Sequence, residues 1–359
     1  MRTIRQTNEE RVSIFRETQD HHPPHTPTRT TFFDHVVQTF FEGNTETMFR
    51  ELGINRAVFA AALNIVDSVP LQRRGRPGFV HSHKDRLLFL MAFLVSGTKG
   101  LKLMCFPRLV CPMAILRDLH EVAKSFLDPL TRNTIWFRHE RADGLPLVSC
   151  VVDCTVVEIN GPDLPFMQKD EYFSGKHKRH CLKKEVIVNV RSGTAAMVSA
   201  EYPGSVADIE VLRRHAADVN RMVGHTTMLA DKGYRGDTNV PNCHVVNDAV
   251  EAEVVQRLVV ERFFGRLKSL FMVFSRRWEF TGKYFSTYFN IACALTNLSI
   301  LVSPLNQDDW EFNNNLLAKW EREEAERIRA SQERTERRRV RRVVEREEMI
   351  LGFLQRRII

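Results

Sequence analysis

The chain has 359 residues, 43% of them hydrophobic, which is enough for two domains with buried cores. Its formal net charge of +8 and its pI of about 9.2 favour a polyanionic partner without proving one. The seven cysteines contain no CxxC pair, so we expect no zinc site, and their odd number without a signal peptide predicts reduced thiols inside the cell. The longest apolar run we recognise, around residues 87–95, is too short for a membrane span. We therefore expect a soluble intracellular protein with no membrane partner.

The two ends of the chain differ in composition from its middle. Residues 1–45 are rich in Thr, His, Pro and Arg, which predicts a disordered arm. Over residues 304–359 we expect a charged helical tail, because acidic and basic residues alternate there at spacings that pair on a helix surface. A solvated helix is the simplest interpretation of this tail. The arginine-rich run at 337–342 is also consistent with a nuclear import signal or a phosphate contact.

Residues 46–140 have a helical pattern that short loops interrupt. The pattern predicts an apolar helix over residues 84–98 that ends at Gly97, and a second helix over 113–127. Such helices could form a helix-turn-helix domain, with Arg117 and Lys124 facing DNA. They could equally form a helical support layer packed against the next domain, and no residue pattern here decides between the two.

From residue 145 the hydrophobic periodicity becomes that of strands. The segments LVSCVVD, EVIVNVRS and TAAMVSAEY predict three strands, with a turn at Ser192-Gly193 between the last two. TTMLAD and CHVVN predict two more, and helices are expected over residues 251–274 and 283–301. This order predicts an α/β fold, a ribonuclease H-like mixed sheet that forms a catalytic domain over residues 145–303.

Three carboxylates stand on three of these predicted elements. Asp153 lies on the first strand, Asp231 lies just past the fourth, and Glu261 lies on the long helix that follows. In such a fold Asp153 occupies a central strand beside Asp231, and Glu261 projects from a helix packed over both, so the three can converge. Carboxylates without cysteine or histidine partners are the ligands that hard divalent cations prefer. The pattern therefore predicts a metal site.

A fourth acidic residue and several aromatic residues have weaker signals. We expect Ser205 to cap a helix that carries Asp208 at its third position, where Asp208 would interact with the helix dipole at least as readily as with a metal. The aromatic residues of this region are interpreted as core rather than as base-stacking groups; they include Phe263, Phe264, Phe271 and Trp278. In the segment 176–180, His177 and His180 could touch DNA, but the segment is interpreted as an exposed basic hairpin.

Together, several local motifs resemble those of the DDE transposases. They are Asp153-Cys154-Thr155, the aromatic and basic stretch at 172–178, the PGSVAD turn at 203–208, the ADKGY block at 230–234, and Arg257, Glu261 and Lys268 at Arg-x3-Glu-x6-Lys spacing. The resemblance is to the PIF/Harbinger group, to its bacterial insertion-sequence relatives and to Harbinger-derived nucleases of animals. It covers about residues 85–300 and is strongest over 148–280.

The chain also departs from the pattern of that family. Val254 replaces the tyrosine that often precedes the arginine, Cys154 replaces the usual glycine of the first block, and the interval from Asp231 to Glu261 is short. None of these departures removes a carboxylate. They leave open a domesticated or decayed copy of such an element.

The resemblance implies a function and a set of ligands. It implies that Asp153, Asp231 and Glu261 hold two Mg2+ or Mn2+ ions, which promote hydrolysis of a DNA phosphodiester and then strand transfer by the freed 3′-OH. Arg257 and Lys268, which helical spacing puts on the face of Glu261, and also Lys232, are the candidates for contacts with DNA phosphates.

The resemblance also implies partners and a location. The expected partners are double-stranded DNA, both transposon ends and target, a separate Myb-like DNA-binding protein, and further copies of this chain in a homo-oligomer. The expected location is the nucleus. The rival interpretation is a catalytically silent DNA-binding or adaptor protein of the same descent. A structural RNA-binding protein would need stacking aromatics on its strands, and few are present.

Overall fold

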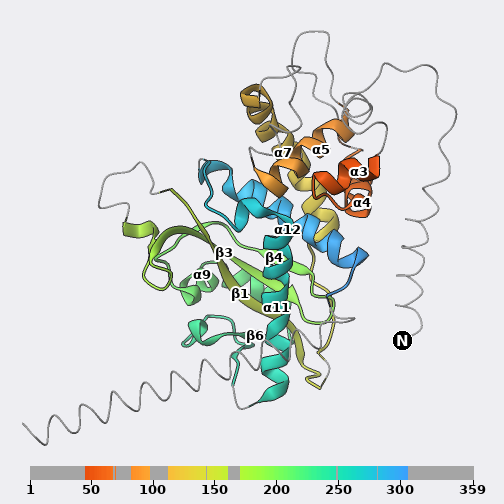
Figure 1. Ribbon diagram of the computed structural model, residues 1–359. Helices are drawn as coiled ribbons and strands as arrows, with labels where there is room; N and C mark the ends of the chain where they lie inside the picture. The colour runs from red at the N-terminus through yellow and green to blue at the C-terminus, as the bar shows by residue number, and fades with distance from the viewer. Residues whose placement is uncertain are drawn as a thin grey trace, which may run out of the picture. The chain divides into compact units, whose positions relative to one another are not determined.

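Figure 1 shows the computed structural model of the chain, which describes residues 45–67, 69, 82–97, 112–142, 144–160, 170–247, 250–280 and 282–305. The side chains of residues 51 and 112–118 are not described. The chain divides into two compact units, Met1–Pro304 and Leu305–Ile359. The predicted arm and the predicted charged tail lie, but for their innermost residues, outside the described ranges. Both therefore stay predictions.

The helical region consists of α3 (Thr45–Glu51), α4 (Arg56–Val66), α5 (His83–Ser96) and α7 (Pro112–Thr134). The start of α5 is fixed by a capping box, in which the Ser82 hydroxyl accepts the N–H of Asp85 and the Asp85 carboxylate accepts the N–H of Ser82. The helix ends at Gly97, whose positive φ of 66° reverses the chain. The apolar helix predicted over residues 84–98 is thus confirmed.

Helix α7 is longer than the segment 113–127 that the sequence predicted. It begins at Pro112, where a proline is tolerated because the first N–H groups of a helix have no partner, and it continues through Pro129. An internal proline removes one helical hydrogen bond and destabilises the helix. The helix persists because one stripe of its residues is buried; these residues are Leu119, Ala123, Phe126 and Leu130. Burial of this stripe therefore outweighs the local cost of Pro129.

The helical region packs against the long C-terminal helix α12 (Phe285–Val302). Both α4 and α7 lie against α12, and α5 contacts α4 and α7. On α7, Lys124 forms an ion pair with Glu121 and lies 5.9 Å from the ring centre of Tyr284, which directly precedes α12. These contacts support the interpretation of a helical support layer. DNA binding by these helices stays a prediction, and the side chain of Arg117 is not described.

The centre of the fold is a mixed sheet. Its strands are β1 (Val148–Glu158), β2 (Phe173–Ser174), β3 (Arg179–Asn189), β4 (Ala195–Val198), β5 (Tyr202–Pro203), β6 (Thr227–Ala230) and β7 (Cys243–Val245). Their order is β2-β3-β1-β6-β7, while β4 and β5 also pair with β3. β1 is antiparallel to β3 and parallel to β6, and β6 is parallel to β7. All five predicted strands are present, and β1 is central, as predicted.

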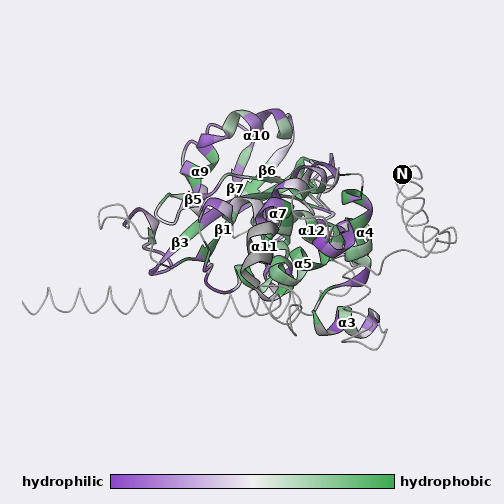
Figure 2. Cartoon of the chain, turned by 90° about the horizontal axis from the view of Figure 1, so that it is seen from above, coloured by the Kyte–Doolittle hydropathy of each residue, from purple (hydrophilic) through white to green (hydrophobic). Residues whose placement is uncertain are grey.

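Helices cover the two faces of this sheet. On one face, Cys150 and Val152 of β1 form a core with Leu212 and Val219, which come from α9 (Asp208–Arg214) and α10 (Ala216–Val223). The other face carries α11 (Glu251–Leu270) and α12, which contact β1 and β4 respectively. In Figure 2, β1 and α5 are coloured mostly hydrophobic, whereas the outer helices α9 and α10 have hydrophilic segments. Side chains of successive β1 residues therefore enter two different layers.

The start of α9 differs from the prediction. Ser205 is not the N-cap; Ala207 occupies that position without a side-chain hydrogen bond, and Asp208 is the first helical residue rather than the third. The turn before α9 is set by other contacts, since Pro203 pairs with β3 and its carbonyl accepts the N–H of Val206. The prediction was wrong because these strand contacts lie beyond the local sequence pattern.

The most apolar long helix is α12, not the run around residues 87–95. The segment Gly282–Val302 is long and apolar enough to cross a membrane, but 72% of its apolar window is buried inside the fold. Its polar side chains have partners there: the Asn297 amide donates to carbonyl oxygens of Thr134 and Ala195 and accepts the N–H of Ala195. A helix that is apolar on all sides and buried on all sides is the central helix of a core.

Candidate active site

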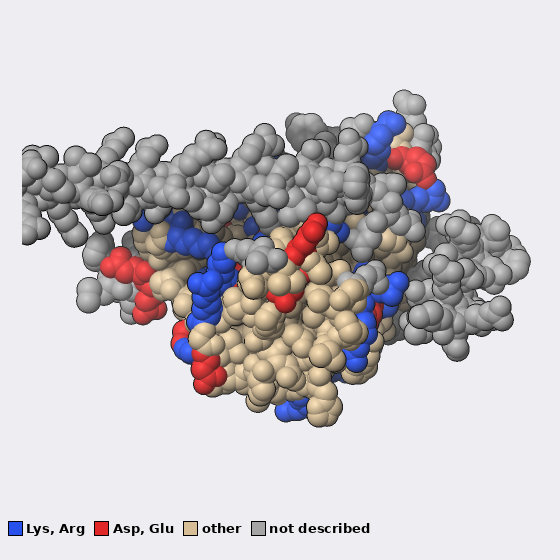
Figure 3. Space-filling model, turned by 90° about the horizontal axis from the view of Figure 1, so that it is seen from below, with Lys and Arg blue, Asp and Glu red and all other residues tan. Residues whose placement is uncertain are grey.

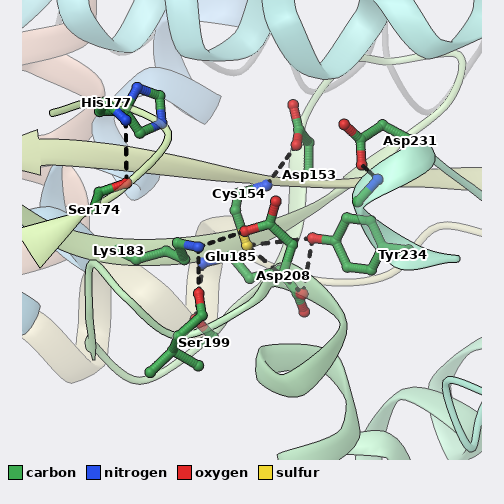
Figure 4. A network of polar contacts seen from close by, with 12 residues as sticks. Asp153, Cys154, Ser174, His177, Lys183, Glu185, Ser199, Asp208, Asp231 and Tyr234 are labelled. Carbon is green, nitrogen blue, oxygen red and sulfur yellow. Dashed lines mark hydrogen bonds and ion pairs between the residues drawn. The ribbon is translucent and has the colours of Figure 1, made fainter. Parts of the chain in front are cut away.

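Two of the predicted carboxylates come from neighbouring parallel strands. The register pairs Val152 of β1 with Ala230 of β6, so the residues that follow them, Asp153 and Asp231, are neighbours at this point of the sheet. In Figure 4, the carboxylates of Asp153 and Asp231 lie on the same side of the strands. The predicted convergence of these two residues is therefore visible in the structure.

The Asp153 carboxyl group lies in an environment that disfavours its charge. Burial, and next the nearby charge of Asp231, raise the pKa of Asp153 to about 7. Two groups oppose this rise: the N–H of Cys154, which donates to Asp153 Oδ1 at 2.7 Å, and the guanidinium of Arg257. A buried carboxyl group beside a second carboxylate forms a site that a cation would stabilise.

Asp231 is held by the turn that follows it. The chain forms a short 3-10 helix, η1 (Lys232–Tyr234), and Asp231 Oδ1 accepts the N–H of Gly233 at 2.8 Å. A Cβ atom on Gly233 would lie 2.9 Å from this Oδ1 and 2.9 Å from Oδ2 of Asp208. A side chain at position 233 would therefore displace one or both of these carboxylates.

Glu261 comes from α11, which packs over β1, β3 and β6. Its pKa is raised mainly by burial; the charge of Asp231 raises it further, and Arg257 opposes the shift. Arg257 Nη1 lies 2.8 Å from Glu261 Oε1, and both side chains are largely buried. Asp231 thus raises the pKa of both other predicted carboxylates, which places all three in one electrostatic neighbourhood.

The three predicted carboxylates fit a hard divalent cation in their chemistry. All are oxygen donors, and burial disfavours the charged forms of Asp153 and Glu261. Within the part of the chain that the structure describes, no three histidine, cysteine, aspartate or glutamate side chains already form a compact ligand group. Oε1 of Glu261 is paired with Arg257, so an ion shared with the two aspartates would share this oxygen with Arg257 or replace it as the partner.

The predicted phosphate contacts surround these carboxylates. Lys268 lies on α11 and donates to the carbonyl oxygen of Val156 on β1 at 3.3 Å. Burial lowers the pKa of Lys268, and the charge of Asp153 opposes this shift. Lys232 is exposed and directly follows Asp231. These positions agree with a role near a bound phosphate, although contacts with DNA stay a prediction.

Asp208 takes part in a buried ion pair. Its Oδ1 lies 2.6 Å from Nζ of Lys183, and only 12% and 10% of the two side chains, respectively, are exposed. Lys183 also donates to the carbonyl oxygen of Val206, so it fixes the start of α9. The sequence could not show this partner because Lys183 lies 25 residues earlier on another strand. Asp208 thus borders the site with its charge already paired, and it remains a secondary candidate.

One buried residue beside the site had no role in the sequence prediction. Glu185 of β3 is 1% exposed and contacts both His215 and Tyr234. It was missed because it follows two lysines, which makes that part of the strand look like a solvated end. The one available signal of its burial was its position directly before the apolar run 186–188.

The aromatic residues are core, as expected. Trp278 is 1% exposed and stacks on Phe274, and Phe263, Phe264 and Phe271 are also buried. Residues 175–178 form the exposed turn between β2 and β3, so the basic hairpin is confirmed as well. On the face drawn in Figure 3, lysine and arginine side chains lie in separate groups around an uncharged area, with acidic groups among them. That face does not concentrate the net positive charge.

A mixed sheet that carries one aspartate on β1 and another just past β6, beneath a helix that supplies a glutamate, is consistent with the fold of a DDE nuclease. Residues 152–297 match the family model described as DDE superfamily endonuclease. This range contains Asp153, Asp231 and Glu261, and the match supports a transposase-type nuclease at the family level. No curated protein and no solved structure matches the chain.

Proposed function

We propose that the chain is a DDE transposase or transposase-derived endonuclease of Harbinger type that hydrolyses DNA phosphodiester bonds. One observation carries the proposal: within the matched range, the β1–β6 register makes Asp153 and Asp231 neighbours beneath α11, the helix that bears Glu261. The topology, with β1 between antiparallel β3 and parallel β6, supports a ribonuclease H-like sheet.

The site would hold two Mg2+ or Mn2+ ions through Asp153, Asp231 and Glu261. Bound ions of this kind lower the pKa of an attacking water and neutralise charge on the departing 3′ oxygen. The residues themselves supply fixed oxygen donors on rigid elements, two from adjacent strands and one from the covering helix. No protein nucleophile is required for hydrolysis, and the freed 3′-OH would serve as the nucleophile for strand transfer.

Basic residues on both sides of the carboxylates would bind the DNA backbone. Lys268 reaches β1 from α11, Arg257 lies beside Glu261, and Lys232 follows Asp231 directly. Such contacts position DNA without reading its sequence. Recognition of transposon ends would then require a further element, either the helices before β1 or a separate Myb-like protein. A homo-oligomer would hold two DNA ends together, and the nucleus would be the place of action.

One observation favours the alternative of a catalytically silent DNA-binding protein of the same descent. Glu261 is paired with Arg257, and the described residues contain no compact ligand group. The two interpretations differ in what they require, since only the enzyme must bind divalent ions and cleave DNA.

The test is divalent-ion-dependent cleavage of plasmid and oligonucleotide DNA by the purified full chain, with Mg2+ and with Mn2+. We expect cleavage that disappears in Asp231→Asn and in Glu261→Gln, while Glu279→Gln, an exposed glutamate outside the site, cuts normally. Equal cleavage by all four proteins would reveal a contaminating nuclease and refute the assigned site. DNA binding without cleavage by the unaltered folded chain would point either to a missing partner protein or to the silent alternative.

A further inference from the structure

A buried polar network lies on the far side of the sheet from the Asp153 carboxylate. The Tyr234 hydroxyl donates to Glu185 Oε2 at 2.9 Å and lies 3.3 Å from Sγ of Cys154. The other oxygen of Glu185, Oε1, lies 2.7 Å from Nε2 of His215. Figure 4 shows Cys154, Glu185 and Tyr234 together, on the opposite side of the strand from Asp153.

The direction of these hydrogen bonds follows from the number of protons available. Tyr234 has a single hydroxyl proton and gives it to Glu185, so the Cys154 thiol is free to donate to the Tyr234 oxygen or to Glu185 Oε2, which lies 4.0 Å from its sulfur. Tyr234 is fully buried and Glu185 is 1% exposed, so water cannot replace a lost partner. Buried polar groups that satisfy one another fix a single geometry, because each broken bond leaves an unpaired group.

The network connects the two chain segments that carry the aspartates. Cys154 directly follows Asp153, and Tyr234 closes the turn that begins at Asp231. Because side chains alternate along a strand, Asp153 faces α11 while Cys154 faces the network. Glu185 lies directly opposite Cys154 in the β1–β3 register, so it contacts the network at the level of Cys154 from the neighbouring strand.

The position of the network along the strands explains why it is needed. The β1–β6 ladder ends at the pair Val152 and Ala230, one residue before the two aspartates. Beyond that pair, β6 leaves the sheet into η1, and ladder hydrogen bonds no longer set the separation between the segments. The contact of Tyr234 with Cys154 and Glu185 continues the connection past this point.

We propose that Tyr234 is a positioning residue, which acts with Glu185 to hold Asp153 and Asp231 at the separation that a divalent ion requires. This inference rests on the proposed function, since it assumes that the two aspartates are metal ligands. Tyr234 and Glu185 touch neither metal nor DNA. Their effect is to keep the aspartates preorganised, as partners behind metal ligands do in other sites.

The test compares two buried tyrosines that each lose only a hydroxyl group. Tyr234→Phe removes the bonds to Glu185 and Cys154. Tyr288→Phe is the matched control, because its buried hydroxyl lies 2.7 Å from His120 Nδ1 in the contact between α12 and α7. Mn2+ affinity of the full chain without DNA is measured by electron paramagnetic resonance, and thermal unfolding is recorded for each protein.

We expect both variants to unfold at lower temperature than the unaltered chain, but only Tyr234→Phe to bind Mn2+ about tenfold more weakly. Glu185→Gln, which retains the shape of the side chain, should weaken Mn2+ binding in the same direction, and it keeps the test decisive if Tyr234→Phe does not fold. Unchanged Mn2+ affinity in Tyr234→Phe or Glu185→Gln would overturn the inference. Equal weakening in Tyr288→Phe would overturn it too, since the loss would then reflect general stability.

The same measurement separates failure of this inference from failure of the proposed function. Asp231→Asn serves as the reference for the metal site itself. If the unaltered chain bound no Mn2+, or if Asp231→Asn bound it equally well, the assigned metal site would be wrong and the positioning role would be lost with it. If the unaltered chain binds Mn2+ tightly, Asp231→Asn abolishes this binding and Tyr234→Phe leaves it unchanged, then the metal site is correct and only the positioning role of Tyr234 is refuted.

Discussion

The guanidinium of Arg257 lies 2.8 Å from the carboxylate of Glu261, one helical turn further along α11. Glu261 therefore has a cationic partner within the chain, at the position where the proposed function assigns it to a metal ion. Ion pairs of this spacing are weak on exposed helices, but these two side chains are only 18% and 27% exposed. A metal ion bound at this position would compete with Arg257 for Oε1 of Glu261.

This competition predicts opposite effects of one substitution on metal binding and on catalysis. Arg257→Gln should increase the affinity of the DNA-free chain for Mn2+ by roughly threefold or more, because a partly buried ion pair no longer opposes binding. DNA cleavage should fall, since a phosphate contact is lost. Arg266→Gln, on the same helix but bonded to Ser299 and Ser303, should change neither property. Weaker Mn2+ binding by Arg257→Gln would show that Arg257 supports the metal site instead.

The raised pKa of Asp153 predicts how stability depends on pH. Because its pKa is about 7 in the folded chain against 3.8 normally, the folded state holds this proton more tightly than the unfolded state. The metal-free chain should therefore lose stability as pH rises from about 4 to about 7. Asp153→Asn removes this loss and should be more stable than the unaltered chain at pH 8, by on the order of 1–3 kcal/mol.

Urea unfolding at pH 5.5 and pH 8 in the presence of a chelator measures this effect. The advantage of Asp153→Asn should be larger at pH 8 than at pH 5.5. The unaltered chain should also bind Mn2+ more tightly as pH rises through about 7, since protons compete for Asp153. An Asn variant that is less stable at pH 8 would contradict the assigned environment of Asp153.

A third prediction concerns the close approach of two carboxylates to Gly233. Gly233→Ala would introduce a Cβ 2.9 Å from oxygens of both Asp208 and Asp231, so the carboxylates or the turn must shift. We expect a loss of about 1–3 kcal/mol in stability and loss of cleavage. Gly265→Ala is the control, because this exposed position in α11 has open space and alanine favours helix by up to about 1 kcal/mol. Chemical unfolding and a cleavage assay distinguish the two variants.

A fourth prediction separates the two basic regions that could bind DNA. Replacing both Lys176 and Lys178 by Gln, in the exposed β2–β3 turn, should weaken DNA binding. It should also reduce the slope of log K against log salt concentration by about one to two. Lys124→Gln with Arg132→Gln on α7 should have little effect if α7 belongs to a support layer. Fluorescence anisotropy with duplex DNA at several salt concentrations measures both. A larger effect of the α7 pair would favour the helix-turn-helix interpretation.

Local patterns predicted much of the fold correctly, because many boundaries depend on neighbouring residues. Gly97 ends α5 through its own backbone conformation, and Ser82 starts that helix with a partner three residues away. Asp231 was expected at the end of a strand, and β6 ends at Ala230. The spacing of Arg257 and Glu261 predicted a shared helix face, and their ion pair shows it. In each case the determining contacts lie within a few residues.

The incorrect predictions involve partners that are distant in sequence. Ser205 does not cap α9, since the turn is held by strand pairing and by Lys183. Helix α7 continues through Pro129 because its buried stripe packs against the fold. The apolar length of α12 was overlooked, and its burial could not have been inferred from composition alone.

The sequence by itself determined the types of residues at the site, the elements that carry them and their family, since these depend on local periodicity and on motifs. Only the tertiary structure decided which charges are already paired and which polar groups are buried together. Lys183 with Asp208 and Tyr234 with Glu185 are outcomes of that kind. The physical reason is that desolvation and hydrogen bonding depend on distances between segments, and sequence order does not specify those distances.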